Sequence, residues 1–155
     1  MTSRRLAAIA GAGSAAMLLA AFGFQMLGYA PCELCILQRW PHAAAVVVAA
    51  LAWVTGWSRA LALAGLLAAV AASALGVYHG GVEYGWWAGP AQCSGGVGDI
   101  ASMSIQDLTA RLQAAPVVRC DEVAWRLAGL SMAMWNAILS AVLAVIWAAA
   151  ARQRQ

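Results

Sequence analysis

The amino-acid sequence predicts an all-α membrane protein, a four-transmembrane-helix bundle with one long extramembrane loop that carries a short interfacial helix. Of the 155 residues, 64% are hydrophobic and only 10% are charged, whereas a soluble domain usually carries about 25% charged residues. The mean hydropathy is +0.76, and the length leaves room for about four spans of roughly 20 residues each. We therefore expect residues 1–155 to form a single membrane domain.

Four apolar runs account for the predicted spans. The first run follows Arg4 and Arg5 and covers about 6–29. A cleaved signal peptide is the alternative for this run, but the apolar part of such a peptide has only about 7–15 residues. The first run therefore indicates an uncleaved span. The other three runs predict spans over about 35–57, 60–78 and 127–151.

The only long hydrophilic stretch lies between the third and fourth spans, over about 80–122. Within it, the apolar residues Ile105, Leu108 and Leu112 recur at helical spacing, which indicates an amphipathic helix. Ser104 is the expected N-cap of this helix. The pattern predicts a short helix, over about 104–115, lying on the membrane surface.

The distribution of charge predicts the orientation of the chain. The net charge is +3, and the basic residues are scattered without forming a stripe, so we expect no nucleic-acid partner. All six acidic residues fall on one side of the predicted membrane, and the arginines without acidic neighbours fall on the other. The positive-inside rule then places both termini in the cytoplasm and the long loop outside. These arginines are Arg4, Arg5, Arg59, Arg152 and Arg154.

The motif Pro31-Cys32-Glu33-Leu34-Cys35, followed by Arg39, is the strongest chemical signal in the sequence. If Pro31 opens a helix, both thiols lie on one helical face, and Arg39 lies one turn beyond Cys35. The positive end of the helix dipole and a nearby guanidinium both favour the thiolate, which is the reactive form of cysteine. The alternative is a buried cysteine pair with an arginine that extends to the membrane surface.

Two further cysteines, Cys93 and Cys120, flank the long loop. The predicted orientation places all four cysteines on the outer side, where an oxidising compartment favours disulfides. Four cysteines allow three pairings. An electron relay between two pairs is one interpretation, and purely structural disulfides are another. A zinc site is disfavoured, because such sites usually use two closely spaced pairs and Cys93 and Cys120 are not closely spaced.

These motifs resemble the DsbB family of membrane thiol oxidases, over essentially the whole chain. The Cys32-x-Leu34-Cys35 motif with Arg39 is similar to that family's first redox pair. The second region of similarity is the run into the last span. The segments Tyr78-His79-Gly80-Gly81 and Trp86-Trp87 resemble a short-loop branch of the family. The residues of the second region are Cys120, Trp125, Gly129, Leu130, Met132 and Trp135.

The resemblance implies a disulfide-generating thiol:quinone oxidoreductase of the bacterial inner membrane. In that family, a reduced DsbA-like periplasmic thiol oxidase attacks the disulfide that corresponds to Cys93–Cys120, with Cys93 holding the mixed disulfide. Cys120 then passes electrons to Cys32 and Cys35, and Cys35 gives them to ubiquinone or menaquinone. DsbA-type proteins are strong oxidants, so a lipid-soluble quinone is a suitable final acceptor.

The resemblance also implies a cofactor-binding role for Arg39, His79 is a second candidate, and two other functions stay open. Arg39 is expected beside the quinone. His79 either hydrogen-bonds a quinone carbonyl or is a satisfied interfacial histidine. A vitamin-K-epoxide-reductase-like enzyme is one alternative function, although its CxxC lies late in the chain. A non-enzymatic scaffold stapled by disulfides is the other, and thiol trapping in membranes with and without quinone separates it from an oxidoreductase.

Overall fold

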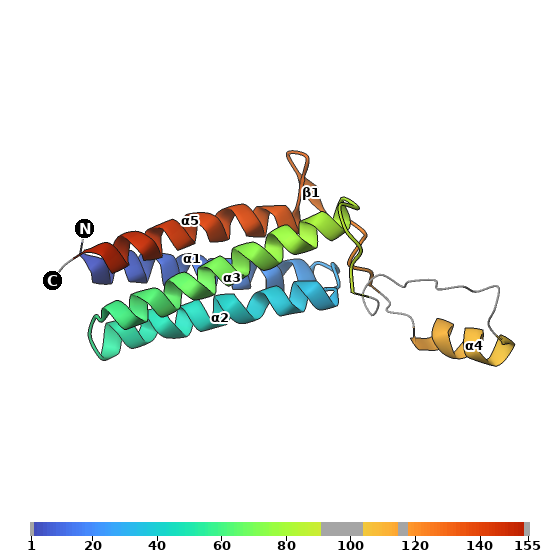
Figure 1. Cartoon of the computed structure of the whole chain (residues 1–155), viewed down its shortest axis with the longest axis horizontal. Coiled ribbons are helices and arrows are strands. Elements are labelled where there is room, and N and C mark those ends of the chain that lie inside the picture. The colour runs from blue at the N-terminus through green and yellow to red at the C-terminus, as the bar shows by residue number, and fades with distance from the viewer. Residues whose placement is uncertain (1, 91–103, 115–117, 154–155) are drawn as a thin grey trace.

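The computed structural model describes residues 2–90, 104–114 and 118–153. Four long helices run side by side, and a short helix and a small antiparallel hairpin lie towards one end of the bundle (Figure 1). In chain order the elements are α1 (Ser3–Met26), α2 (Glu33–Val54), α3 (Arg59–Glu83), α4 (Ile105–Ala114), β1 (Arg126–Leu127), β2 (Leu130–Ser131) and α5 (Met132–Arg152).

Helices α1, α2, α3 and α5 are long and apolar enough to cross a membrane. They have 24, 22, 25 and 21 residues respectively, and a helix of about 20 residues spans about 30 Å, the thickness of the hydrocarbon core. Large apolar side chains on their outer faces, including Leu19 and Leu67, are exposed, as lipid-facing side chains are. The predicted all-α fold with four membrane helices is confirmed.

The four long helices form a closed ring in which each packs on its sequence neighbours and α5 returns to α1. Both chain termini lie at one end of the bundle, together with the turn between α2 and α3 (Figure 1). The turn between α1 and α2, the end of α3 and the hairpin lie at the opposite end. Arg4 and Arg59 therefore lie far from Cys32 and Cys35, as the charge pattern predicts.

Small residues allow the helices to approach closely. A side chain at Gly11 would collide with Ala49 of α2, and one at Gly65 would collide with the buried Trp147 of α5. At Gly76 an added Cβ would lie 2.7 Å from the Ala137 backbone nitrogen. In a membrane, helices associate largely through this kind of tight packing, because apolar side chains gain little by leaving lipid.

Helix α3 continues to Glu83, past Tyr78, where we expected the third span to end and the loop to begin at about residue 80. Gly80 and Gly81 lie inside the helix, where Met134 and Trp87 occupy the space beside them. Gly85, two residues beyond the last helical residue, has a φ of +71 and turns the chain away from the helix. The Trp86 and Gly85 backbone nitrogens donate to Gly81 and Val82 at 2.8 and 3.1 Å, a Schellman motif.

Helix α5 begins at Met132 and not at about residue 127, because residues 126–131 form a hairpin. The two turn residues have positive φ, 51 for Ala128 and 80 for Gly129, as a two-residue type I′ hairpin requires. The Ser131 hydroxyl then caps α5 by accepting from the Met134 nitrogen at 3.2 Å. In Figure 1 the hairpin projects from the start of α5, at the same end of the bundle as the turn between α1 and α2.

The short helix predicted within the loop is present as α4. Ser104 precedes it, and its hydroxyl accepts from the Asp107 backbone nitrogen at 3.1 Å, as expected of an N-cap. Figure 1 shows α4 well away from the four-helix bundle. The expected position of this helix on the membrane surface stays a prediction.

Candidate active site

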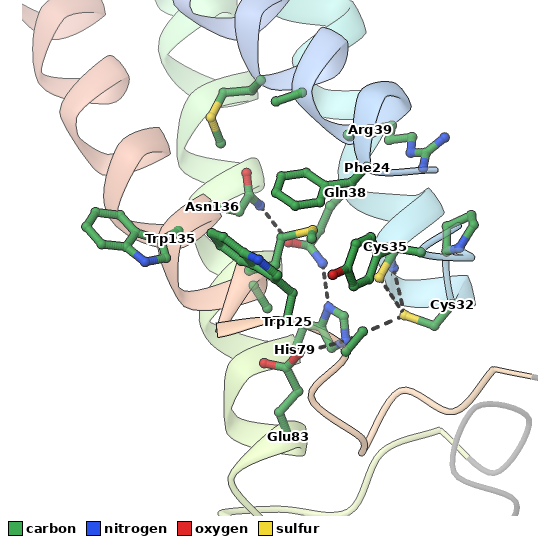
Figure 2. A pocket seen from close by; sticks show the side chains of 18 of the residues that line it. Phe24, Cys32, Cys35, Gln38, Arg39, His79, Glu83, Trp125, Trp135 and Asn136 are labelled. Carbon is green, nitrogen blue, oxygen red and sulfur yellow. Dashed lines mark hydrogen bonds and ion pairs between the residues drawn. The ribbon is translucent and has the colours of Figure 1, made fainter. Parts of the chain in front are cut away.

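The Cys32–Cys35 pair forms the amino-terminal end of α2 (Figure 2). Cys32 is the N-cap, with an extended backbone, and its sulfur accepts from the Cys35 backbone nitrogen at 3.2 Å. The two Sγ atoms are 2.7 Å apart. Cys35 lies in the first helical turn, where the helix dipole stabilises negative charge. The two thiols are therefore close enough to exchange a proton directly.

Cys32 and Cys35 lie in different surroundings. The hydrogen bond to Cys35, and after it burial, raise the pKa of the Cys32 thiol above its ordinary value. Cys32 is almost fully enclosed, with 4% of its surface exposed, whereas Cys35 is half-buried. Cys35 is therefore the member of the pair better suited to carry negative charge and to meet a second molecule.

Cys120 lies in the same buried cluster as Cys32, with Leu34 and Val82. Its exposed fraction is 0%, although it belongs to the irregular segment between α4 and the hairpin. Next to it, Arg119 makes a two-pronged ion pair with Asp121, at 2.9 and 2.6 Å. This pair lowers the pKa of Asp121 below its usual value. The structure thus brings Cys32, Cys35 and Cys120 together; Cys93 lies outside the described residues.

His79 is buried against the cysteine pair, and only 3% of it is exposed. Its Nε2 lies 3.6 Å from the Cys32 sulfur and 3.9 Å from Oε1 of Glu83, one turn further along α3. The Glu83 side chain is itself 5% exposed, and its Oε2 has no hydrogen-bond partner among the residues that the structure describes. The extension of α3 beyond Tyr78 is what places both side chains beside the thiols.

A chain of polar side chains continues from His79 into the apolar bundle (Figure 2). The Gln38 amide nitrogen lies 2.7 Å from Nδ1 of His79, and the Asn136 amide nitrogen donates to the Gln38 oxygen at 2.5 Å. His42 Nε2 lies 2.8 Å from the Asn136 oxygen, and the Ser140 hydroxyl donates to that oxygen at 3.3 Å. Polar residues inside a membrane bundle are costly and usually functional.

Arg39 lies one turn beyond Cys35, as the spacing predicts. Its guanidinium donates to the Gln25 side chain at 2.9 Å and lies 4.7 Å from the centre of the Phe22 ring, both on α1. Its Nε is buried, and within the described part of the chain it has no hydrogen-bond partner. Arg39 therefore has a donor available for a further acceptor.

An apolar cavity of about 340 Å³ opens beside these residues. Its walls come from α1, α2, α3, α5 and the segment on both sides of Cys120, and Figure 2 shows the aromatic rings of Phe24, Trp125 and Trp135 among the residues that line it. Pockets of this size with a few convergent polar groups are typical binding sites for small molecules. The polar groups on its wall include Cys35, Gln38, Arg39, His42, His79 and Asn136.

The sulfurs of Cys32 and Cys35 and a ring nitrogen of His79 lie within 4.8 Å of one another, close enough for a shared metal ion. A histidine that binds a metal usually donates its other ring N–H to an acceptor. Here Nδ1 of His79 faces the amide nitrogen of Gln38, which is itself a donor. This arrangement does not suit ligation through Nε2, so the donor set favours thiol chemistry over a metal site.

Comparison with known proteins identifies the family. The family profile described as "Disulfide bond formation protein DsbB" matches residues 3–150 of this chain. The chain belongs to the DsbB family. DsbB membership agrees with the four membrane helices and with the buried cysteine pair, and it makes this chain a multi-pass membrane protein of disulfide bond formation.

One curated relative is described as "Uncharacterized protein RP370", from Rickettsia prowazekii (strain Madrid E). It is 27% identical to this DsbB-family chain over 118 residues, which cover 76% of this chain and 69% of the relative. No solved structure matches the chain significantly.

Four polar residues near the cysteines were not predicted from the sequence: Gln38, His42, Glu83 and Asn136. Gln38 and His42 lie inside the second predicted span and Asn136 inside the fourth, and such polar residues are a usable signal of a buried site. Glu83 carried no such signal, because it was assigned to the loop. The sequence does not show which polar residues meet, since that depends on the rotation of each helix.

Proposed function

We propose that this DsbB-family protein is a thiol:quinone oxidoreductase that reoxidises a DsbA-like periplasmic thiol oxidase. The observation that carries the proposal is the burial of Cys120 in one cluster with Cys32, next to Cys35 and an apolar cavity. This arrangement supports transfer of a disulfide from the cysteine pair at the membrane to the cysteines of the loop. A protein in which disulfides only staple a loop needs no such cavity.

On the thiol side, the reduced partner attacks a Cys93–Cys120 disulfide, and Cys93 takes the mixed disulfide. A second partner thiol displaces Cys93, so the partner leaves oxidised and the loop pair retains two electrons and two protons. Cys120 then attacks the Cys32–Cys35 disulfide, and Cys93 displaces the thiol bound to Cys120, so the Cys93–Cys120 disulfide forms again and Cys32 and Cys35 become the dithiol. The position of Cys120 beside Cys32 supports this order.

On the quinone side, the cavity fits a flat, apolar head group. Its walls are mainly apolar, and the unpartnered Nε of Arg39 is a buried donor for a carbonyl oxygen. Bound there, ubiquinone or menaquinone supplies an acceptor for two electrons and two protons. Cys35 borders the cavity, and Arg39 orients the acceptor and stabilises negative charge beside Cys35. His79 borders the same cavity.

We further propose that both termini are cytoplasmic and that the cysteines face the periplasm. Arg4, Arg59 and Arg152 lie at the end of the bundle with the termini, whereas Glu33 and Glu83 lie at the cysteine end. The positive-inside rule supports this orientation. A membrane-impermeant maleimide should label Cys93 in intact reduced cells, and labelling only after permeabilisation would reverse the orientation.

The proposed function is tested by the redox state of the cysteines in membranes. Free thiols are trapped with an alkylating reagent in cells with and without quinone, using the wild type and a Cys35→Ser variant. The proposal predicts that Cys32 and Cys35 become reduced when quinone is depleted and return to the disulfide when it is restored. Disulfides that stay fixed under both conditions would instead support a scaffold. Restoration of disulfide formation in a strain that lacks its own periplasmic thiol oxidase tests the partner.

A further inference from the structure

Two backbone carbonyls fix the direction of the polar chain that leads away from His79. The Gln38 amide nitrogen donates to the Leu34 carbonyl at 3.1 Å, and the Asn136 amide nitrogen lies 3.4 Å from the Ala72 carbonyl. A carbonyl oxygen can only accept a hydrogen bond. Each amide must therefore present its nitrogen to its carbonyl and its oxygen to the opposite side, and neither can be turned over without placing two acceptors together.

The orientation of Gln38 determines which nitrogen of His79 carries the proton. Since the Gln38 nitrogen is a donor, the Nδ1 atom 2.7 Å from it must be the acceptor. The proton of the neutral imidazole is then on Nε2. Each of the described groups on that side can accept a hydrogen bond: the Cys32 sulfur at 3.6 Å, the Glu83 carboxyl at 3.9 Å and the backbone of Cys120.

The orientation of Asn136 does the same for His42. The Asn136 amide nitrogen donates to the Gln38 oxygen and the Ala72 carbonyl. The Asn136 side-chain oxygen therefore faces His42 Nε2, at 2.8 Å. That nitrogen must therefore carry a proton too. Two histidines on different helices are thus held in the same tautomer by one pair of amides.

We propose that Gln38 and Asn136 are positioning residues that hold His79 as a neutral Nε2–H donor directed at the Cys32 sulfur. For its chemical consequence this assignment rests on the proposed function. Whenever Cys32 is an attacking or leaving thiolate, the N–H stabilises the charge without taking up a proton, and a hydrogen bond to a charged group is stronger than one to a neutral group. His79 then donates its hydrogen bond to Cys32, and Arg39 is the residue that donates to the quinone.

The tautomer is measured directly by ¹⁵N NMR of the two histidines, in the full-length protein in lipid nanodiscs. The ring-nitrogen shifts distinguish the Nε2–H form, the Nδ1–H form and the charged imidazolium. We expect both histidines to be neutral with the proton on Nε2 at neutral pH. A proton on Nδ1 of His79, or a charged ring, would overturn the proposal. The result does not depend on activity, so it is separate from the fate of the proposed function.

A Gln38→Glu variant replaces the amide nitrogen that donates to Nδ1 of His79 by a carboxylate oxygen that accepts, and it keeps the size of the side chain. We expect it to draw a proton to Nδ1, which changes the ¹⁵N spectrum, and to slow oxidation of the Cys32–Cys35 dithiol about tenfold, the size of one hydrogen bond to a charged group. The pH profile should also change. The described titratable groups around His79 are Cys32 and Cys35 at the start of α2, Glu83 of α3 and Cys120 of the segment before the hairpin. Arg126 of the hairpin acts on Glu83.

The matched control is Ser73→Ala, which removes another hydrogen bond between α3 and α5, from the Ser73 hydroxyl to the Ala137 carbonyl at 2.9 Å. It should leave the ¹⁵N spectrum and the pH profile unchanged. An Asn136→Asp variant should weaken the hold on Gln38 and alter the His79 signals from a distance. If both Gln38→Glu and Asn136→Asp show the wild-type tautomer and pH profile, the amide pair does not position His79.

Discussion

His79 Nε2 lies 3.6 Å from the sulfur of Cys32. The contact joins the last turns of α3 to the N-cap residue of α2. Because α3 continues past Tyr78, the His79 imidazole lies beside the cysteine pair and is buried. Glu83 is brought to the same place one turn later. The surroundings of the cysteine pair are therefore formed by residues at the start of α2 and at the end of α3.

The position of Cys120 predicts a specific disulfide. In a Cys35→Ser/Cys93→Ser variant only Cys32 and Cys120 remain, and both belong to one buried cluster. Mild oxidation should join them within the chain, as seen by mass spectrometry of the alkylated protein. The same variant in denaturant is the control and should oxidise more slowly. Equal rates in the two conditions would mean that the fold does not hold Cys120 beside Cys32.

Arg39 is predicted to act on the quinone and on Cys35. Arg39→Gln should raise the Michaelis constant for quinone several-fold to tenfold, the equivalent of about 1–1.4 kcal/mol for a charge-assisted contact. Arg39→Lys should recover part of the loss, since it keeps the charge but not the planar group. Arg59→Gln, at the far end of the bundle, is the control. Unchanged quinone kinetics in a folded Arg39→Gln protein would remove Arg39 from the site.

Close packing of α3 on α5 is tested at Gly76. A Cβ at this position would lie 2.7 Å from the Ala137 nitrogen, so Gly76→Ala should push the helices apart and lower the free energy of unfolding by about 1–3 kcal/mol. Gly23→Ala is the control, because nothing lies within 4 Å of the added atom and alanine favours a helix. Denaturation in mixed micelles measures both, and equal stability would contradict the packing.

The Arg119–Asp121 ion pair beside Cys120 predicts a small acid-dependent effect. The pair lowers the pKa of Asp121 in the folded protein, so the unfolded chain binds more protons near its ordinary pKa of 3.8. Its stabilisation is complete above that pH and disappears as the pH falls through the lowered pKa. Thermal unfolding is measured at a series of pH values for the wild type and for Asp121→Asn. Below about pH 3.8 the free energy of unfolding should fall less steeply with decreasing pH in the variant. An identical pH dependence in the two proteins would show that the pair contributes nothing.

The four membrane helices, and the placement of Cys32, Cys35 and Arg39 on one helical face, could be predicted because both depend on local sequence. Long apolar runs specify spans, and the spacing from Cys32 to Arg39 specifies one helical face. The end of α3 could not be predicted in this way. Gly80-Gly81 was interpreted as the beginning of a loop, but these glycines make room for Met134 and Trp87 within the helix.

The candidate site was predicted only in part. Cys32, Cys35 and Arg39 follow from one motif, whereas the link from Gln38 to Asn136 joins two helices that are distant in the sequence. The hairpin was missed because its residues are apolar enough to be assigned to the last span, and only the positive φ of Ala128 and Gly129 distinguishes it. Contacts of this kind depend on how the helices rotate and pack.

The central claim is that thiols in this protein reduce a quinone. The direct measurement is anaerobic mixing of the reduced, purified protein in lipid with ubiquinone or menaquinone, following quinol by absorbance and free thiols by alkylation. We predict one quinol formed for each pair of thiols lost, with the reaction abolished in Cys35→Ser. Thiols that remain reduced in excess quinone, in a correctly folded protein, would contradict the account.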